Sequence, residues 1–105
     1  MKNICDTKRL YGNEGKQYLE SVISDEPYIN KAKILTYLKN GKTVAVAAGI
    51  AKDILTGERI KGELTCISDD VYTWRSDIIY YVERYNMKLY EDFERYVLMK
   101  MGLVE

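Results

Sequence analysis

The stretch of residues 41–86 constrains the fold more than any other part of the chain. In it an apolar segment, two turn signals, an aromatic segment and an amphipathic segment follow one another without a break. Residues 44–48 form a short apolar run between Gly41 and Gly49. A run of this length, bounded by glycines, is typical of a strand that is covered on both faces. We therefore predict a strand over residues 43–54, bent at Gly49 and closed by a turn at residues 56–58.

Residues 59–67 show the two-residue period of a half-buried strand. One face would carry Ile60, Gly62, Leu64 and Cys66, and the other Arg59, Lys61, Glu63 and Thr65. This alternation predicts a second strand, antiparallel to the first. Cys66 is interpreted as a small, buried apolar side chain.

The connection to a third strand, residues 71–75, decides which side chains face the core. A two-residue loop would place the aromatic side chains of Tyr72 and Trp74 on the polar face of the second strand. A three-residue loop over residues 68–70 pairs Cys66 with Tyr72 and Leu64 with Trp74, which keeps one apolar face. In such a loop Asp70 takes the left-handed conformation. We therefore predict a three-stranded antiparallel sheet.

A helix is predicted directly after this strand, over residues 76–86. Ser76 is expected to cap it, and Asn86 is expected to end it. The spacing i, i+3, i+4, i+7 marks an inward stripe of Ile78, Tyr81, Val82 and Tyr85. Because this stripe faces the core, Asp77, Tyr80 and Arg84 are predicted to project away from it.

The flanking segments complete an α+β fold, with two helices before the sheet and two after it. Residues 1–11 are predicted to form an irregular arm or a short edge strand. Helices are expected over residues 13–23, from Pro27 to a stop at Asn40 and Gly41, and over residues 90–101 before Gly102. A chain of 105 residues is long enough for one core, so residues 1–105 are expected to form a single compact domain.

The composition argues against an enzyme, a metal site or a bound cofactor. The chain contains no His, which is the commonest general base and the commonest metal ligand, and its two cysteines lie far apart in the sequence. The carboxylates of Asp53, Glu58, Asp69 and Asp70 lie on predicted turns and could meet around a hard cation. Their usual role is that of solvated turn residues, and we adopt that interpretation.

The sequence predicts a cytoplasmic protein. Its two cysteines come without a secretory segment, and no apolar run approaches the length of a membrane span, so reduced thiols and no membrane contact are expected. Basic and acidic residues number 16 each, so there is no basic surplus to hold nucleic acid.

Binding to another protein is the function that the sequence favours. Ten residues are Tyr, which is favoured at interfaces, and the balanced charge fits a protein surface. In composition the chain resembles small cytosolic inhibitors of bacteria and their phages, namely antitoxins, immunity proteins and anti-defence proteins, which act by occluding a partner. One alternative is a single-strand nucleic-acid reader that stacks bases on Tyr72 and Trp74 beside Arg59, Lys61 and Arg75. Another is a housekeeping adaptor that forms a homodimer.

The surface predicted to bind the partner consists of Arg75, Asp77, Tyr80 and Arg84. Tyr80 and Arg84 are four residues apart on the predicted helix, so the ring and the guanidinium group can lie against each other. Arg75 would join them from the end of the preceding strand. Tyr and Arg are the side chains most often found as interface anchors, so this group is the candidate site.

Overall fold

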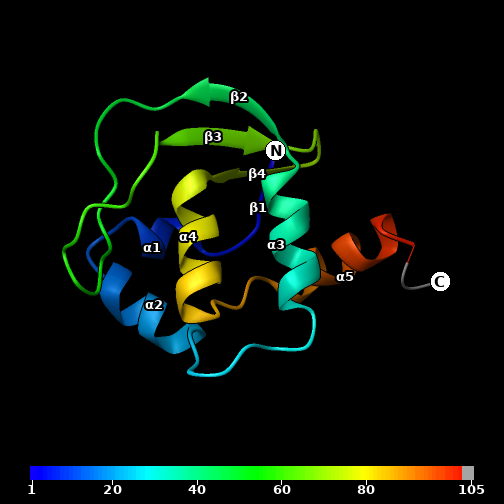
Figure 1. Ribbon diagram of the computed structural model, residues 1–105, viewed down its shortest axis with the longest axis horizontal. Coiled ribbons are helices and arrows are strands. Elements are labelled where there is room, and N and C mark those ends of the chain that lie inside the picture. Colours follow the sequence, from blue (N-terminus) through cyan, green and yellow to red (C-terminus); the bar gives the residue numbers. More distant parts are fainter. Residues whose placement is uncertain (103–105) are drawn as a thin grey trace.

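The computed structural model describes residues 1–102, which form a layer of strands with helices packed against it (Figure 1). The elements are β1 (Lys2–Asn3), α1 (Thr7–Leu10), α2 (Gly15–Val22), α3 (Lys31–Lys39), β2 (Lys42–Val46), β3 (Thr65–Ser68), β4 (Tyr72–Arg75), α4 (Ser76–Tyr85) and α5 (Glu91–Lys100). The predicted α+β class is confirmed. Among the described residues, no helix has both the length and the apolar character needed to cross a membrane.

The sheet has four strands in the order β1-β4-β3-β2, and it is mixed. β2 and β4 both pair antiparallel with β3, whereas β1 pairs parallel with β4. The prediction of three antiparallel strands is therefore wrong in number and in type. The N-terminal segment supplies the extra strand, which confirms the short edge strand predicted as one alternative for residues 1–11, and the unpredicted helix α1. Its backbone is fixed by contacts with distant residues, such as the 3.0 Å hydrogen bond from the Lys2 amide to the Val71 carbonyl, and no local sequence period reports such contacts.

The two long strands predicted over residues 43–54 and 59–67 are much shorter in the structure. β2 ends at Val46 and β3 begins at Thr65; between them only one isolated bridge forms, joining Lys52 to Arg59. Gly49 and Gly62 both adopt φ of +98°, a left-handed conformation that turns the chain out of the sheet. The prediction that the first strand is covered on both faces is also wrong, because every residue of β2 is exposed.

The register between β3 and β4 differs from the prediction. Ile67 pairs with Trp74 and Cys66 pairs with Arg75, so Ile67 faces the core and Cys66 does not. Cys66 is half-buried, and the predicted burial of this residue is wrong. The buried thiol is that of Cys5, and this burial raises its pKa to about 12.

Side chains in the β3–β4 turn explain the register. The Asp69 carboxylate accepts hydrogen bonds from the amides of Val71 and Tyr72 at 3.0 and 2.6 Å, and the Ser68 hydroxyl accepts one from the Asp70 amide at 2.9 Å. These bonds close a connection over residues 69–71, which is shifted by one residue from the predicted loop over residues 68–70. The left-handed conformation predicted for Asp70 is confirmed, with φ of 75°.

The helices agree with the prediction better than the strands do. α2, α3, α4 and α5 all form, and the predicted stop at Asn86 is confirmed by its left-handed φ of 57°. Two predicted starts are wrong. α3 begins at Lys31 instead of Pro27, and the Ser76 hydroxyl does not cap α4. This hydroxyl instead accepts a hydrogen bond from the Thr65 amide at 3.0 Å, which ties the helix to β3.

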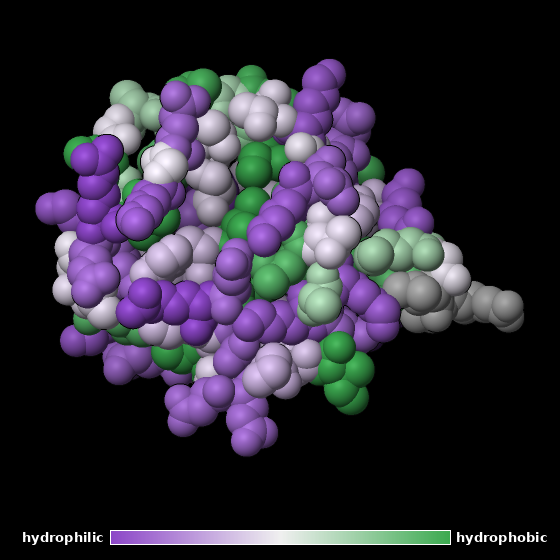
Figure 2. Space-filling model, in the orientation of Figure 1, coloured by the Kyte–Doolittle hydropathy of each residue, from purple (hydrophilic) through white to green (hydrophobic). Residues whose placement is uncertain are grey.

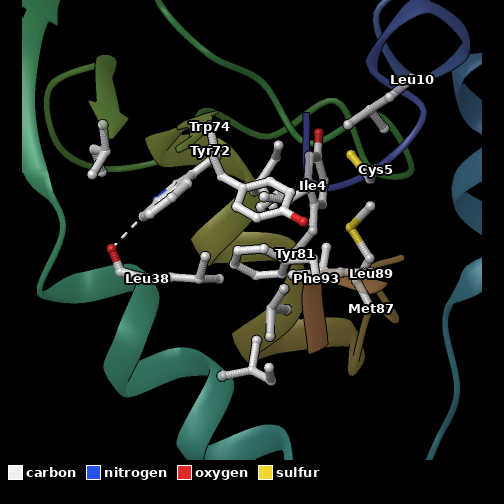
Figure 3. Packing of buried hydrophobic residues seen from close by; sticks show 14 of the residues in the cluster. Ile4, Cys5, Leu10, Leu38, Tyr72, Trp74, Tyr81, Met87, Leu89 and Phe93 are labelled. Atoms are coloured by element: carbon white, nitrogen blue, oxygen red, sulfur yellow. Dashed lines mark hydrogen bonds between the residues drawn. The ribbon is translucent and has the colours of Figure 1, made fainter. Parts of the chain in front are cut away.

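The core lies between the sheet and the helices α3, α4 and α5, and its centre is aromatic (Figure 3). Trp74 is 3% exposed, and its ring centroid lies 6.0 Å from that of Phe93 and 6.4 Å from that of Tyr37. The Trp74 Nε1–H donates a 3.3 Å hydrogen bond to the Leu38 carbonyl at the end of α3. The indole thus joins β4 to α3 and α5.

Gly41→Ala is expected to lower the free energy of unfolding by about 1 to 3 kcal/mol, because the added methyl group would overpack a filled site. A Cβ at this position would lie 2.5 Å from Ile67 Cγ2 and 2.7 Å from Trp74 Cζ2. Urea denaturation measures the change. The neighbouring exposed Asn40→Ala serves as the control and is expected to stay within about 0.5 kcal/mol of the wild type. Equal stability of the two variants would contradict the close contact.

Candidate functional site

A cleft of about 500 Å³ lies between α4 and the long segment that connects β2 to β3. Three of the four residues predicted to bind a partner line it: Asp77, Tyr80 and Arg84. On the opposite side it is lined by Ala51 and by residues 58–64. The fourth predicted residue, Arg75, lies outside the lining, at the N-terminal end of α4. The structure therefore gathers most of the predicted site around one depression.

Asp53 fastens the connecting segment to α4. Its side chain is 1% exposed and accepts hydrogen bonds from the hydroxyl groups of Tyr80 at 2.6 Å and Tyr85 at 2.5 Å. It also accepts bonds from the amides of Leu55 at 2.8 Å and Thr56 at 3.2 Å. Burial alone would raise the pKa of this carboxyl, but the four hydrogen bonds outweigh burial and hold the pKa below its ordinary value.

Tyr81 makes a second attachment between α4 and the same segment. Its hydroxyl accepts a hydrogen bond from the Ile54 amide at 3.2 Å and donates one to the Lys52 carbonyl at 3.1 Å. Residues 52–56 are therefore held by three tyrosines of one helix, although they form no regular secondary structure beyond the bridge at Lys52. Because Lys52 also pairs with Arg59, this attachment holds the start of the cleft wall that residues 58–64 form.

Asp77 does not project away from the core, so the prediction for this residue is wrong. Its side chain is 4% exposed; one carboxylate oxygen accepts a 2.8 Å bond from the Tyr11 hydroxyl, and the other lies 3.0 Å from Arg75 Nη2. The Arg75 guanidinium group lies over the Tyr11 ring, 3.9 Å from its centroid. Burial raises the pKa of Asp77 despite these partners. The physical reason for the burial is the N-terminal segment, which brings Tyr11 over the first turn of α4.

The predicted contact between Tyr80 and Arg84 is confirmed. The guanidinium carbon of Arg84 lies 6.0 Å from the Tyr80 ring centroid and 5.5 Å from that of Tyr85. Arg84 is exposed and Tyr80 is half-buried. Because the Tyr80 hydroxyl is bound to Asp53, this residue offers a partner its ring and not its hydroxyl.

Sequence reasoning does not find two important residues of the site. The turn pattern predicts that Asp53 is a solvated turn residue, and its burial shows that this interpretation is wrong. The spacing of Asp53 before Thr56 and Gly57 does signal a turn, but nothing in the sequence signals the tyrosines that it binds. Tyr11 falls in the predicted arm without a role, because its partners Arg75 and Asp77 lie far away in the sequence.

The lining of the cleft combines apolar side chains with charges of both signs. The charged side chains are Glu58, Arg59, Lys61, Glu63, Asp77, Glu83 and Arg84, and the apolar ones are Ala51, Ile60, Leu64 and Ile79. Within residues 1–102, no group of three or more acidic, Cys or His side chains is placed to hold a metal ion. The stacking platform of the nucleic-acid alternative does not form, because Tyr72 and Trp74 are 7% and 3% exposed and face the core.

Comparison of the chain with protein-family models, with curated proteins and with solved structures returns no match. The chemistry of the cleft is therefore judged on its geometry. A depression that combines apolar side chains with charges of both signs can contact a bound molecule through both kinds of side chain. Its charge balance favours a segment with mixed charge over a polyanion.

Proposed function

We propose that this protein is a non-enzymatic protein-binding module that binds a partner protein and inhibits it by occluding part of the partner's surface. The partner docks on the cleft surface, defined here as residues 58–64 together with Ile79, Tyr80, Glu83 and Arg84 of α4. The observation that carries the proposal is the attachment of residues 52–56 to α4 through Asp53 and three tyrosines. A surface that is already fixed loses little conformational entropy on binding, which favours affinity.

The side chains on the cleft surface match those that anchor protein interfaces. Arg84 lies over two tyrosine rings, and Arg and Tyr are enriched among residues that contribute most to binding. Half-buried Ile79 and Leu64 provide apolar contact area next to them. The occlusion mechanism and a cytoplasmic location are part of the proposal, and they rest on the resemblance in composition to small inhibitors.

The charge pattern of the cleft favours a protein partner over nucleic acid. Four carboxylates, those of Glu58, Glu63, Asp77 and Glu83, line the cleft together with its basic side chains. A phosphate backbone would be repelled by them, whereas a protein segment with charges of both signs can pair with both kinds.

The Lys61→Ala, Arg84→Ala double variant is expected to weaken capture of the partner at least about tenfold. Its thermal midpoint should stay close to that of the wild type, since both side chains are exposed. Quantitative affinity capture from the native host compares this variant with the wild type as baits. The matched control is Lys8→Ala, Lys16→Ala, which removes two exposed positive charges from α1 and α2. If the Lys61→Ala, Arg84→Ala variant captures the partner as well as the control variant does, docking on the cleft surface is contradicted.

A further inference from the structure

The outer edge of β2 is uncovered. β2 is the last strand of the sheet, and among the described residues no other strand pairs with its outer side (Figure 1). Its apolar side chains are exposed, with Val44 at 51% and Val46 at 63%, and Ile50 beyond the strand is 58% exposed. In Figure 2 hydrophobic residues are visible along the upper rim of the molecule, where Figure 1 places β2.

The sequence of this edge lacks most of the features that protect edge strands in monomeric proteins. Residues 43–51 contain no charged residue and no proline, although 30% of the chain is charged. Edges are commonly blunted by charges, prolines, bulges or covering loops. Here a shift in register between Thr43 and Ala45 marks a bulge, and Lys42 is the one charge on the strand. An exposed edge with so little protection is suited to pairing with another strand.

The hydrogen bonds within the sheet show which backbone groups are free. The Ala47 amide donates a 2.8 Å bond to the Leu64 carbonyl, so the backbone groups of Ala47 point toward the β3 side. Successive residues of a strand point their groups to opposite sides, so those of Ala45 also point inward and those of Val46 point to the open edge. The open edge can therefore extend the antiparallel ladder.

We propose that β2 pairs antiparallel with β2 of a second copy of this chain, about a twofold axis at Ala45. This pairing places Val44 opposite Val46 of the second copy and brings Lys42, on the far side of the bulge, toward Ala48, so no charge faces another charge. The two Lys42 residues would lie about 20 Å apart, beyond the Debye length of physiological salt. The strand is thus complementary to itself, as an isologous interface requires.

The overall charge also allows two copies to associate. The chain carries 16 basic and 16 acidic residues, so two copies do not repel each other through net charge. No residue of β2 lines the cleft between α4 and residues 51–64. Dimerisation is therefore independent of the proposed function, and the two can be tested separately.

Cross-linking at Ala45 tests the twofold axis directly. Residues of a pair that does not exchange hydrogen bonds have Cα atoms about 4.5 Å apart, which is within reach of a disulfide. The Ala45→Cys, Cys66→Ser variant keeps the buried Cys5 and adds a single thiol on the edge. Mild oxidation is expected to convert most of this variant to a covalent dimer. The matched control is Glu20→Cys, Cys66→Ser, which carries an exposed thiol on α2 and is expected to stay largely monomeric.

Sedimentation velocity over a range of protein concentrations gives the second test. The wild type is expected to dimerise reversibly, and the Val44→Lys, Val46→Lys variant to dimerise at least about tenfold more weakly, because like charges would meet on the edge. Equal cross-linking of the edge-thiol variant and its α2 control would overturn the proposal. So would a wild type that is monomeric at every concentration, and this outcome would leave the edge to a strand of a different protein. If the Val44→Lys, Val46→Lys variant dimerises as strongly as the wild type, the interface lies elsewhere and the proposal is also overturned.

Discussion

Trp74→Ala is expected to lower the free energy of unfolding by about 3 to 5 kcal/mol, as for other large buried aromatic side chains. The indole is 3% exposed and contacts aromatic rings from both α3 and α5, so its removal leaves a cavity between three elements. The bond from its Nε1–H to the Leu38 carbonyl would be lost as well.

Urea denaturation followed by circular dichroism measures the change caused by Trp74→Ala. Tyr90→Ala is the matched control, since that aromatic side chain is 47% exposed and is expected to shift stability by less than about 1 kcal/mol. A Trp74→Ala variant whose denaturation midpoint equals that of the wild type would show that the indole does not join β4 to the helices.

Asp53→Ala is expected to lower the free energy of unfolding by about 3 kcal/mol, because the hydroxyls of Tyr80 and Tyr85 and two backbone amides lose a charged acceptor. The substitution is expected to loosen residues 52–56 locally as well as to destabilise the whole fold. Residues 52–56 should exchange their amide hydrogens faster in the variant, since they remain attached to α4 only through Tyr81. An unchanged exchange rate in these residues would contradict the role of Asp53.

The carboxyl group of Asp53 is expected to make the stability of the protein depend on pH. The pKa of Asp53 is lower in the folded protein than its ordinary value, so its stabilisation is fully present above the pKa of the unfolded chain, about 3.9. It is lost as the pH falls through the folded pKa. Asp77 acts in the opposite sense because its folded pKa is raised. The difference in stability between the wild type and Asp53→Asn isolates the contribution of Asp53, and this difference should shrink below about pH 4.

Several tyrosine hydroxyls of this protein donate hydrogen bonds to carboxylates on other segments of the chain. Tyr11 binds Asp77, Tyr37 binds Asp69 at 2.5 Å, and Tyr80 binds Asp53. In each case the two residues lie on different segments of the chain. The abundance of tyrosine in the sequence favours an interface, and these bonds give many of the tyrosines an internal role instead.

The helices could be predicted because their signals are local. The apolar stripe of α4 and the left-handed stop at Asn86 are both contained within the helix and its next residue. The register of β3 could not be predicted from apolar alternation, because the hydrogen bonds of Ser68 and Asp69 in the turn decide it. The alternation along residues 59–67 suggests one long strand, but the structure pairs only its last residues, from Thr65 onward, in the sheet.

The candidate site shows the same division between local and distant effects. The contact of Tyr80 with Arg84 follows from a spacing of four residues on a helix, and the structure contains it. The burial of Asp77 depends on Tyr11, and the burial of Asp53 depends on Tyr80 and Tyr85. These pairs are brought together only by the completed fold, so the sequence pattern does not reveal them.

Hydrogen–deuterium exchange on the complex with the captured partner tests the proposed function most directly. The partner for this measurement is the one retained by the wild type and by the Lys8→Ala, Lys16→Ala control. We expect its binding to slow exchange in residues 58–64 and 79–84, which contain the cleft surface on its two sides. Slower exchange confined to α2 or α5, with these two segments unchanged, would contradict the assignment of the cleft as the docking surface.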